Sequence, residues 1–210
     1  MEKDDLVSFL NVMTKSYGIF KKDKYPLAGR TEIVIKNFSL TGMVVFKNYF
    51  RGGFLSLINR RTYFRFRKEM RPVTEFFLLE KMRDLGLPVP EPVAAYYRGR
   101  YIYQGGIVTK YIKSSYTLAE YSIKFPEKAE KIFKGQFLSV YEKLLQNKIY
   151  HVDLHPGNVL VGEGEKIFVI DFDKAFISEE LPFYLNEKYV KRWNRSILKH
   201  NLPDFLIMSN

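Results

Sequence analysis

The spacing of apolar residues changes along this chain, and each spacing predicts a different element. A continuous apolar, β-branched run over residues 41–47 predicts a buried strand, and its last residue, Lys47, supplies one cation. Two further β-rich runs, at 159–161 and 167–170, flank a glycine-containing turn and predict a hairpin. The hairpin joins two polar segments, so its register decides which of their side chains face each other.

A helical spacing of apolar residues predicts a helix over residues 73–85, which ends at Gly86 and the proline two residues later. Its apolar face carries three residues at intervals of three, four and seven from Glu75, namely Leu78, Leu79 and Met82. A carboxylate on an apolar face is costly unless it is paired, so we expect Glu75 to pair with Lys47. The alternative is a half-solvated Glu75 in the first turn, where the helix macrodipole favours an acidic side chain.

Two polar motifs on either side of the hairpin carry the candidate chemistry. The first is His-Val-Asp-Leu-His-Pro-Gly-Asn at 151–158, and the second is Asp-Phe-Asp at 171–173. Pairing centred near Gly164 sets Asn158 opposite Asp171, with Cα atoms roughly 5 Å apart. A carboxylate and an amide oxygen that converge in this way suit Mg²⁺, which takes its remaining ligands from water and substrate phosphates.

Asp153 lies five residues before Asn158, at the other end of a short loop. There its carboxylate is placed to accept the proton of an attacking hydroxyl, in line with a transferred phosphoryl group. The two motifs together therefore predict a phosphoryl-transfer site. The alternative is a plain surface loop followed by a hairpin whose acidic ends are solvated, but the complete set at this spacing favours the site.

The arrangement resembles the catalytic loop and metal-binding segment of protein kinases, with Asp153, Asn158 and Asp171 at the matching positions. Asp173 stands where protein kinases have glycine, and no Ala-Pro-Glu triplet follows it. Both departures argue against a protein substrate. The run 155–158 is instead similar to small-molecule and lipid-sugar kinases of the same superfamily.

A more specific resemblance covers residues 29–176. The stretches 46–53, 75–92 and 171–174 together resemble the lipopolysaccharide kinase family. The resemblance implies ATP as the phosphoryl donor and Mg²⁺ as the metal. It implies a hydroxyl of a 3-deoxy-D-manno-octulosonic acid (Kdo) sugar on lipid A, or on a related lipid-sugar, as the acceptor.

The resemblance also implies roles for single residues. Lys47 falls at the basic position of the third strand, where it grips nucleotide phosphate, and Glu75 falls at the position of its ion-pair partner. Asp153 falls at the catalytic position, while Asn158 and Asp171 fall at the metal positions. The glycine-rich phosphate loop expected before the strand is reduced to a single residue, Gly29, which is either a phosphate contact or a plain turn residue.

The implied fold is α+β and two-lobed, like that of protein kinases. A small, β-rich N-terminal lobe with one long helix occupies residues 1–112 and binds the nucleotide, and a mainly helical, shortened catalytic lobe occupies 113–210. The boundary falls within 103–117, where Gly105–Gly106 precedes an apolar run that forms the adenine-binding strand and hinge of this fold. Pro126 then opens a helix that leads into the catalytic loop. One face of that helix is formed by Phe133, Phe137, Val140, Tyr141 and Leu144.

The composition of the chain is consistent with a folded protein in a reducing compartment. The 210 residues are enough for a sizeable core, and the absence of cysteine suits a reducing compartment. The acidic start at residues 1–5 differs from a signal peptide, and no apolar run approaches the length of a membrane span. We therefore expect a cytoplasmic protein.

The charge is unevenly distributed. The formal net charge is +11, and residues 51–71 hold seven basic residues against Glu69, which gives +6. Phenylalanine, tyrosine, leucine and isoleucine are interleaved with these basic residues. Such a mixture suits an anionic membrane surface, so we expect peripheral binding to the cytoplasmic face of the inner membrane. The alternative is a solvated basic face.

A second basic cluster lies near the C-terminus and consists of Lys188, Lys191, Arg192, Arg195 and Lys199. Tyr189, Trp193 and Ile197 repeat beside it at a spacing of four residues. Either this is a second membrane face, or it is a solvated basic surface over ordinary core aromatic residues. We expect no nucleic-acid binding, because no DNA- or RNA-binding module is visible.

Three hypotheses remain in order. The first is a lipopolysaccharide kinase with ATP and Mg²⁺ between its lobes. The second is another small-molecule or protein phosphotransferase of the same fold. The third is a catalytically inactive, basic membrane-binding module that kept the kinase fold, and the presence of Lys47, Asp153, Asn158 and Asp171 argues against it.

Overall fold

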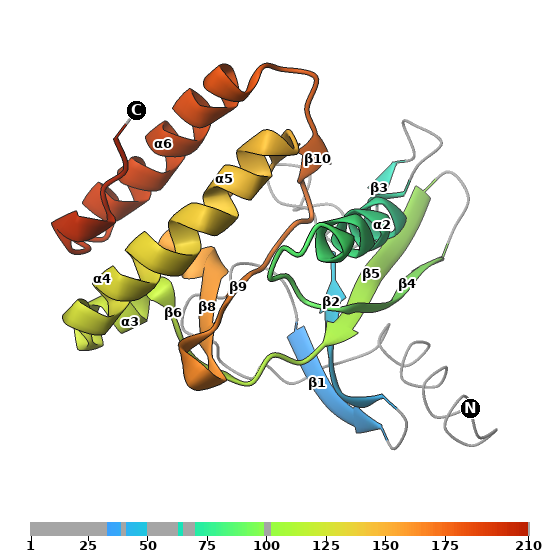
Figure 1. The fold of residues 1–210 in the computed structure, drawn as a ribbon. Coiled ribbons are helices and arrows are strands. Elements are labelled where there is room, and N and C mark those ends of the chain that lie inside the picture. The colour runs from blue at the N-terminus through green and yellow to red at the C-terminus, as the bar shows by residue number, and fades with distance from the viewer. Residues whose placement is uncertain (1–32, 39–40, 50–62, 65–69, 99–101, 210) are drawn as a thin grey trace. The chain divides into compact units, whose positions relative to one another are not determined.

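The computed structural model describes residues 33–38, 41–49, 63–64, 70–98 and 102–209. Gly29 and most of the basic segment 51–71 lie outside these residues. The fold is mixed α+β, as predicted (Figure 1). The chain divides into two compact units, the first formed by Met1–Phe77 and Glu91–Tyr111 and the second by Leu78–Pro90 and Ile112–Asn210.

The first unit is built on an antiparallel sheet. Its strands are β1 Ile33–Phe38, β2 Gly42–Asn48, β3 Tyr63–Phe64, β4 Pro92–Arg98 and β5 Ile102–Lys110. Strand β5 pairs with β2, β3 and β4, and β1 pairs with β2. The predicted apolar strand is β2, whose Val44 and Phe46 are completely buried. Lys47, on the opposite face of β2, pairs in register with Ile107 of β5.

Gly105 and Gly106 lie inside β5, so the expectation that they precede this strand is wrong. A Cβ atom on Gly105 would stand 2.6 Å from the carbonyl oxygen of Tyr96, and one on Gly106 would stand 2.7 Å from the Tyr96 hydroxyl and closer still to the carbonyl oxygen of Lys47. The two glycines therefore let β2 and β4 approach β5 closely, which no residue with a side chain allows.

Helix α2 spans Arg71–Asp84, close to the predicted bounds. The predicted apolar face is buried, because Glu75, Leu78, Leu79 and Met82 are at most 7% exposed. Gly86 ends the helix with φ +69°, and the N–H groups of Gly86 and Leu87 donate to the carbonyls of Arg83 and Met82, both at 2.9 Å. This is the glycine helix end that the sequence predicts.

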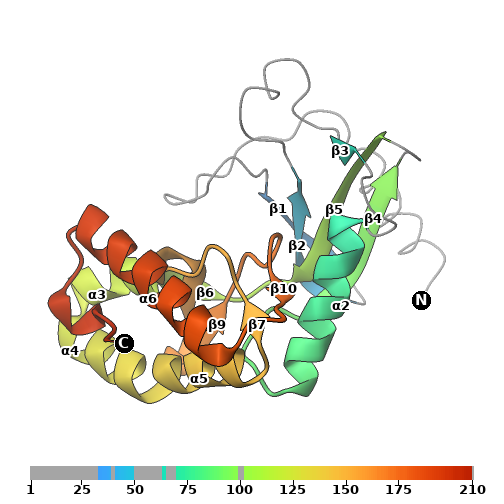
Figure 2. The same cartoon turned by 90° about the horizontal axis from the view of Figure 1, so that it is seen from above.

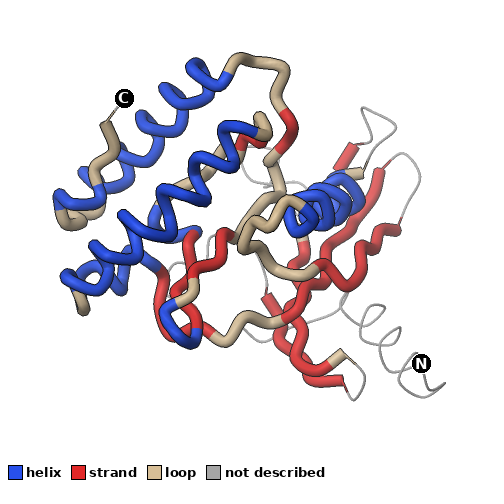
Figure 3. Tube along the Cα trace, viewed as in Figure 1, coloured by secondary structure: helices blue, strands red, loops and turns tan. Residues whose placement is uncertain are grey.

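The second unit is mainly helical, as the blue segments of Figure 3 show. Its helices are α3 Leu118–Lys124, α4 Pro126–Ile132, a π-helical turn Phe133–Phe137, α5 Leu138–Gln146 and α6 Pro182–Lys199, with short 3₁₀ turns at Pro156–Asn158, Glu163–Glu165 and Asp204–Leu206. Its strands are β6 Ser114–Thr117, β7 Ile149–Tyr150, β8 Val159–Gly162, β9 Ile167–Val169 and β10 Phe176–Ile177. Strand β8 pairs with β6 and β9, and β7 pairs with β10.

The core of the second unit lies where α5 and the π-helical turn meet α6, which runs alongside them in both views (Figures 1 and 2). The five predicted core residues from Phe133 to Leu144 are all buried. The ring of Phe137 stacks on Trp193 with centroids 4.2 Å apart, and the indole N–H of Trp193 donates to the Leu206 carbonyl at 2.7 Å. These contacts fix α6 against the preceding helices.

The aromatic stripe of α6 is therefore part of the core. Tyr189, Trp193 and Ile197 are each at most 1% exposed, so the interpretation of this stripe as a second membrane face is wrong. A period of four residues marks a buried face without saying whether protein or lipid covers it. Among the described residues, no helix is long and apolar enough to cross a bilayer.

Candidate active site

The first unit contains a buried ion pair. The ammonium group of Lys47 lies 3.3 Å from a carboxylate oxygen of Glu75, and the two side chains are 15% and 4% exposed. The hydroxyl of Tyr49 donates to the other Glu75 oxygen. The structure confirms the predicted pair and excludes the half-solvated Glu75. Because Glu75 accepts on both oxygens, its buried charge is compensated and Lys47 is held in a fixed orientation.

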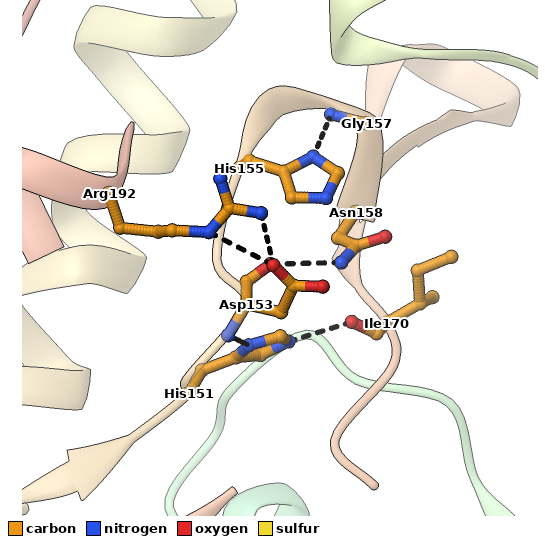
Figure 4. Close-up of polar contacts among 7 residues, drawn as sticks. All are labelled: His151, Asp153, His155, Gly157, Asn158, Ile170 and Arg192. Atoms are coloured by element: carbon orange, nitrogen blue, oxygen red, sulfur yellow. Dashed lines mark hydrogen bonds and ion pairs between the residues drawn. The ribbon is translucent and has the colours of Figure 1, made fainter. Parts of the chain in front are cut away.

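In the second unit, the loop between β7 and β8 carries the motif 151–158, and His151 anchors its start (Figure 4). His151 Nδ1 accepts the backbone N–H of Asp153 at 3.2 Å, so the ring proton lies on Nε2, which donates to the Ile170 carbonyl at 2.9 Å. The ring also meets Phe172 edge-on at 4.5 Å. His151, which is 1% exposed, thereby ties the loop to the Asp-Phe-Asp segment.

A second histidine of the same loop, His155, also has a fixed tautomer. His155 Nδ1 accepts the Gly157 N–H at 3.1 Å, which leaves the proton on Nε2 as a donor. Burial lowers the pKa of His155 below its ordinary value, although the nearby Asp153 carboxylate opposes this effect. The ring is therefore a neutral hydrogen-bond donor near pH 7.

The hairpin register differs from the predicted one by one residue. Val159 pairs with Val169, and the Ile170 N–H donates to the Asn158 carbonyl at 2.9 Å. Asn158 thus faces Ile170, and the prediction that it lies opposite Asp171 is wrong. The observed pairs are centred on Gly164, half a residue earlier than a pairing of Asn158 with Asp171 requires. Gly164 and its successor both have positive φ within this turn.

Asp171 follows the last paired residue and takes a left-handed conformation, with φ +69°. This conformation is uncommon for a residue other than glycine and persists where the surroundings hold it. The neighbours on both sides are held, since the Ile170 carbonyl accepts from His151 and Phe172 is 1% exposed. The chain therefore turns sharply at Asp171 as it leaves the hairpin.

Asn158 has a defined orientation. Its side-chain amide donates through Nδ2 to the Asp153 carbonyl at 2.9 Å, and its Oδ1 points away from the loop (Figure 4). Asp171 lies near enough to Asp153 for the charges of the two carboxylates to interact. The amide oxygen of Asn158 and the carboxylate of Asp171, which directly follows the residue bonded to Asn158, are oxygen donors of the kind that a hard divalent cation such as Mg²⁺ prefers.

The structure adds a site residue that the sequence reasoning missed. Arg192 of α6 donates to Asp153 Oδ1 through Nε at 3.0 Å and through one terminal nitrogen (Figure 4). Burial raises the pKa of the Asp153 carboxyl, but the hydrogen bonds and charge of Arg192 outweigh this effect and leave the pKa below its ordinary value. Arg192 was visible only as one member of the C-terminal basic cluster. Its partner lies 39 residues away, and no spacing in the sequence points to it.

Helix α6 also holds the loop through Tyr189. The Tyr189 hydroxyl accepts the His151 N–H at 2.8 Å and donates to the Ile149 carbonyl at 2.7 Å. Burial raises the pKa of Tyr189, so the hydroxyl stays protonated and can make both bonds. The side chain of Asp153 thus stands on a loop that is fixed from two sides, by His151 and by α6.

Comparisons with known proteins identify one family for this chain. The model of the lipopolysaccharide kinase (Kdo/WaaP) family matches residues 28–204. The 3-deoxy-D-manno-octulosonic acid kinase of Vibrio vulnificus (strain YJ016) is 33% identical over 132 residues, which cover 62% of this chain and 55% of that protein. The 3-deoxy-D-manno-octulosonic acid kinase of Haemophilus influenzae (strain ATCC 51907 / DSM 11121 / KW20 / Rd) is 32% identical over 160 residues, which cover 73% of this chain and 65% of that protein.

Among solved structures, the yeast RNA Pol II CTD kinase CTDK-1 complex matches with a TM-score of 0.48 and 16% identity, covering 78% of this chain and 51% of that chain. The chain belongs to the lipopolysaccharide kinase (Kdo/WaaP) family. It spans between about half and two thirds of the length of the two curated relatives described above.

Proposed function

We propose that this protein transfers the γ-phosphoryl group of ATP to a hydroxyl of a Kdo sugar on lipid A. The observation that carries the proposal is the position of the Asp153 carboxylate, which Arg192 orients on a loop fixed by His151 and Tyr189. Asn158 bonds to the backbone of Asp153, and Asp171 lies close enough for its charge to act on the Asp153 carboxylate. Family membership and the names of the relatives support the acceptor. The assignment of residues 1–112 to nucleotide binding and 113–210 to catalysis belongs to the same proposal.

In this mechanism Asp153 positions the acceptor hydroxyl. Arg192 occupies Oδ1, which leaves Oδ2 to accept the hydroxyl proton as the acceptor oxygen attacks the γ-phosphorus. The new O–P bond forms while the bond from the γ-phosphorus to the bridging oxygen breaks, and ADP leaves with that oxygen. In phosphoryl transfer the protein forms no covalent bond to the transferred group, so most of the catalytic effect comes from this positioning and from electrostatic stabilisation.

The remaining residues act on the phosphates. Lys47, oriented by Glu75, would hold a nucleotide phosphate through its ammonium group. Asn158 and Asp171 would hold Mg²⁺, which supplies positive charge to the transferring phosphoryl group when bound. The Nε2–H of His155 is a neutral donor on the same loop as Asp153, available to an oxygen of the acceptor or of the phosphoryl group.

We also propose that the protein works at the cytoplasmic face of the inner membrane, where a lipid-linked acceptor would be presented. The net charge of +11 and the basic, aromatic segment 51–71 support this location. The segment lies mostly outside the described residues, so this part of the proposal rests on its composition.

The direct test is incubation with ATP, Mg²⁺ and a Kdo-bearing lipid A precursor, followed by mass spectrometry. We expect the acceptor to gain one phosphoryl group. Transfer to a small-molecule or protein acceptor, with none to the Kdo lipid, would instead support another phosphotransferase of this fold. Absence of any Mg²⁺–ATP effect in a thermal-shift assay would point to an inactive membrane-binding module.

A further inference from the structure

The guanidinium group of Arg192 uses only part of its hydrogen-bonding capacity on Asp153. Its Nε and one terminal nitrogen donate to Asp153 Oδ1, while the other terminal nitrogen points away from Asp153, on the side of His155 (Figure 4). Within the part of the chain that the structure describes, the Arg192 side chain makes no other hydrogen bond. The Arg192 side chain is 35% exposed, which leaves part of it accessible to a ligand.

The outer edge of a guanidinium presents two parallel N–H donors and matches the two oxygens of a carboxylate, or two oxygens of a phosphate. An anion bound there would lie next to Asp153, because the same guanidinium contacts both groups. A ligand held in this way would therefore present its neighbouring atoms, including a hydroxyl, to the free oxygen of Asp153.

We propose that Arg192 binds the carboxylate of the acceptor sugar and so selects an acidic sugar whose hydroxyl is placed beside Asp153. This inference rests on the proposed function, whose acceptor is by name an acid. Arg192 is then a specificity-determining residue: it recognises the acceptor and positions the base. A phosphate, either on lipid A or on the nucleotide, is the other source of an anion with the required chemistry, and the experiment separates these sources.

The position of Arg192 indicates that its contact with Asp153 is a fixed part of the structure and not a chance pairing of two surface side chains. Its neighbour Trp193 is fully buried against Phe137, and Tyr189, one turn earlier, is bonded to the backbone of the catalytic loop. The Cα of Arg192 is therefore fixed relative to Asp153 by the core of the unit. Arg195 lies three residues further along the same helix and is exposed, which makes it a matched control for loss of one positive charge from α6.

The test measures binding of the Kdo monosaccharide and of its methyl ester, which lacks the carboxylate charge, by calorimetry with the full chain. The variants are Arg192→Leu, Arg192→Lys and the control Arg195→Leu. We expect wild type and Arg195→Leu to prefer the acid to the ester by roughly 10- to 100-fold, the range expected for a hydrogen-bonded charge pair. Arg192→Leu should lose this preference, and Arg192→Lys should keep only part of it because lysine lacks the planar fork.

Equal binding of acid and ester by wild type, or no binding of either, would overturn the proposal. So would an unchanged preference in Arg192→Leu. A loss of ATP binding in Arg192→Leu, with the preference for the acid intact, would assign the arginine to nucleotide phosphate. A preference for the lipid A phosphates would appear as tighter binding of phosphorylated than dephosphorylated lipid A that depends on Arg192, again with acid and ester bound equally.

These binding measurements do not require turnover, so they remain informative if phosphoryl transfer is absent. A wild-type protein that binds the acid through Arg192 but transfers no phosphoryl group would refute the proposed function and keep the inference about the acceptor. Transfer to acid and ester with equal efficiency in wild type would support the proposed function and refute the inference about Arg192.

Discussion

Tyr189 and Arg192, three residues apart on α6, hold two points of the same polar segment, the end of β7 and the loop 151–158. The hydroxyl of Tyr189 bonds to the backbone of His151 and Ile149, and the guanidinium of Arg192 bonds to the side chain of Asp153. A helix that follows both polar motifs in sequence thus determines the path of the loop and the orientation of the Asp153 carboxylate.

The first prediction concerns Tyr189→Phe. The change removes both hydroxyl bonds and leaves the buried His151 N–H without its partner, so we expect the free energy of unfolding to fall by about 1–3 kcal/mol. Urea denaturation measures the loss. Tyr184→Phe is the control, since Tyr184 lies on the same helix and is 52% exposed. Equal stability of the two variants would show that the hydroxyl of Tyr189 does not hold the loop.

The second prediction concerns Asp153→Ala. Removal of the proton acceptor should lower turnover by at least about 10²-fold, the usual scale for a positioned acid–base group, and leave nucleotide binding largely intact. Steady-state kinetics and nucleotide titration separate the two effects. Asp204→Ala, a change in the same unit at an exposed aspartate, should leave both unchanged. Near-normal turnover in Asp153→Ala would rule out its catalytic assignment.

The third prediction concerns Asp171→Ala. The variant should lose phosphoryl transfer and the Mg²⁺ dependence of nucleotide binding, because the metal would lose its carboxylate ligand. Thermal shift with ATP, in the presence and absence of Mg²⁺, measures this dependence. If Mg²⁺ still enhanced ATP binding to the variant as strongly as to wild type, Asp171 would not be a metal ligand.

The fourth prediction concerns the ion pair in the first unit. Lys47→Ala and Glu75→Ala should each lower turnover, and the double variant should be little worse than the more damaging single one, because the two residues act through one interaction. A double-mutant cycle on kcat/KM measures the coupling. Fully additive losses would mean that the pair has no shared catalytic role, whatever its distance.

The fifth prediction concerns membrane binding. Replacement of Arg60, Arg61, Arg65 and Arg67 by serine should reduce association with anionic vesicles, because each basic residue near the surface contributes about 1 kcal/mol. Wild-type binding should also weaken with salt, since screening at 0.1 M acts beyond roughly 10 Å. Co-sedimentation across a salt series tests both effects, with ATP affinity as the internal control. Equal pelleting of the two proteins at every salt concentration would identify the segment as a solvated face.

The sequence predicted the elements of this fold better than the details of its turns. Strand β2, helix α2 and the hairpin follow from periodicity, which is a local property. The register of the hairpin does not, because it depends on left-handed residues in the turn, including Glu165, a residue type without a strong preference for that conformation. One residue of register was enough to place Ile170, and not Asp171, opposite Asn158.

The site was predictable to a similar extent. The motif spacing led to Asp153, Asn158 and Asp171, and the cost of a buried charge led to the Lys47–Glu75 pair that the structure confirms. Arg192 was not predictable, because the period of α6 shows which face is buried but not which distant loop its flanking positions reach. Long-range partners of this kind require the tertiary structure.

The glycines of β5 carry a consequence for how this protein tolerates change. A side chain at Gly106 would collide with the backbone of Lys47, so any substitution there must push β2 away from its neighbour. That movement would displace the ammonium group of Lys47 from Glu75 without altering a single charged residue. The position of the Lys47 cation on the adjacent strand therefore requires glycine at 106. A mutation of this uncharged residue can separate Lys47 from Glu75 although it contacts neither side chain.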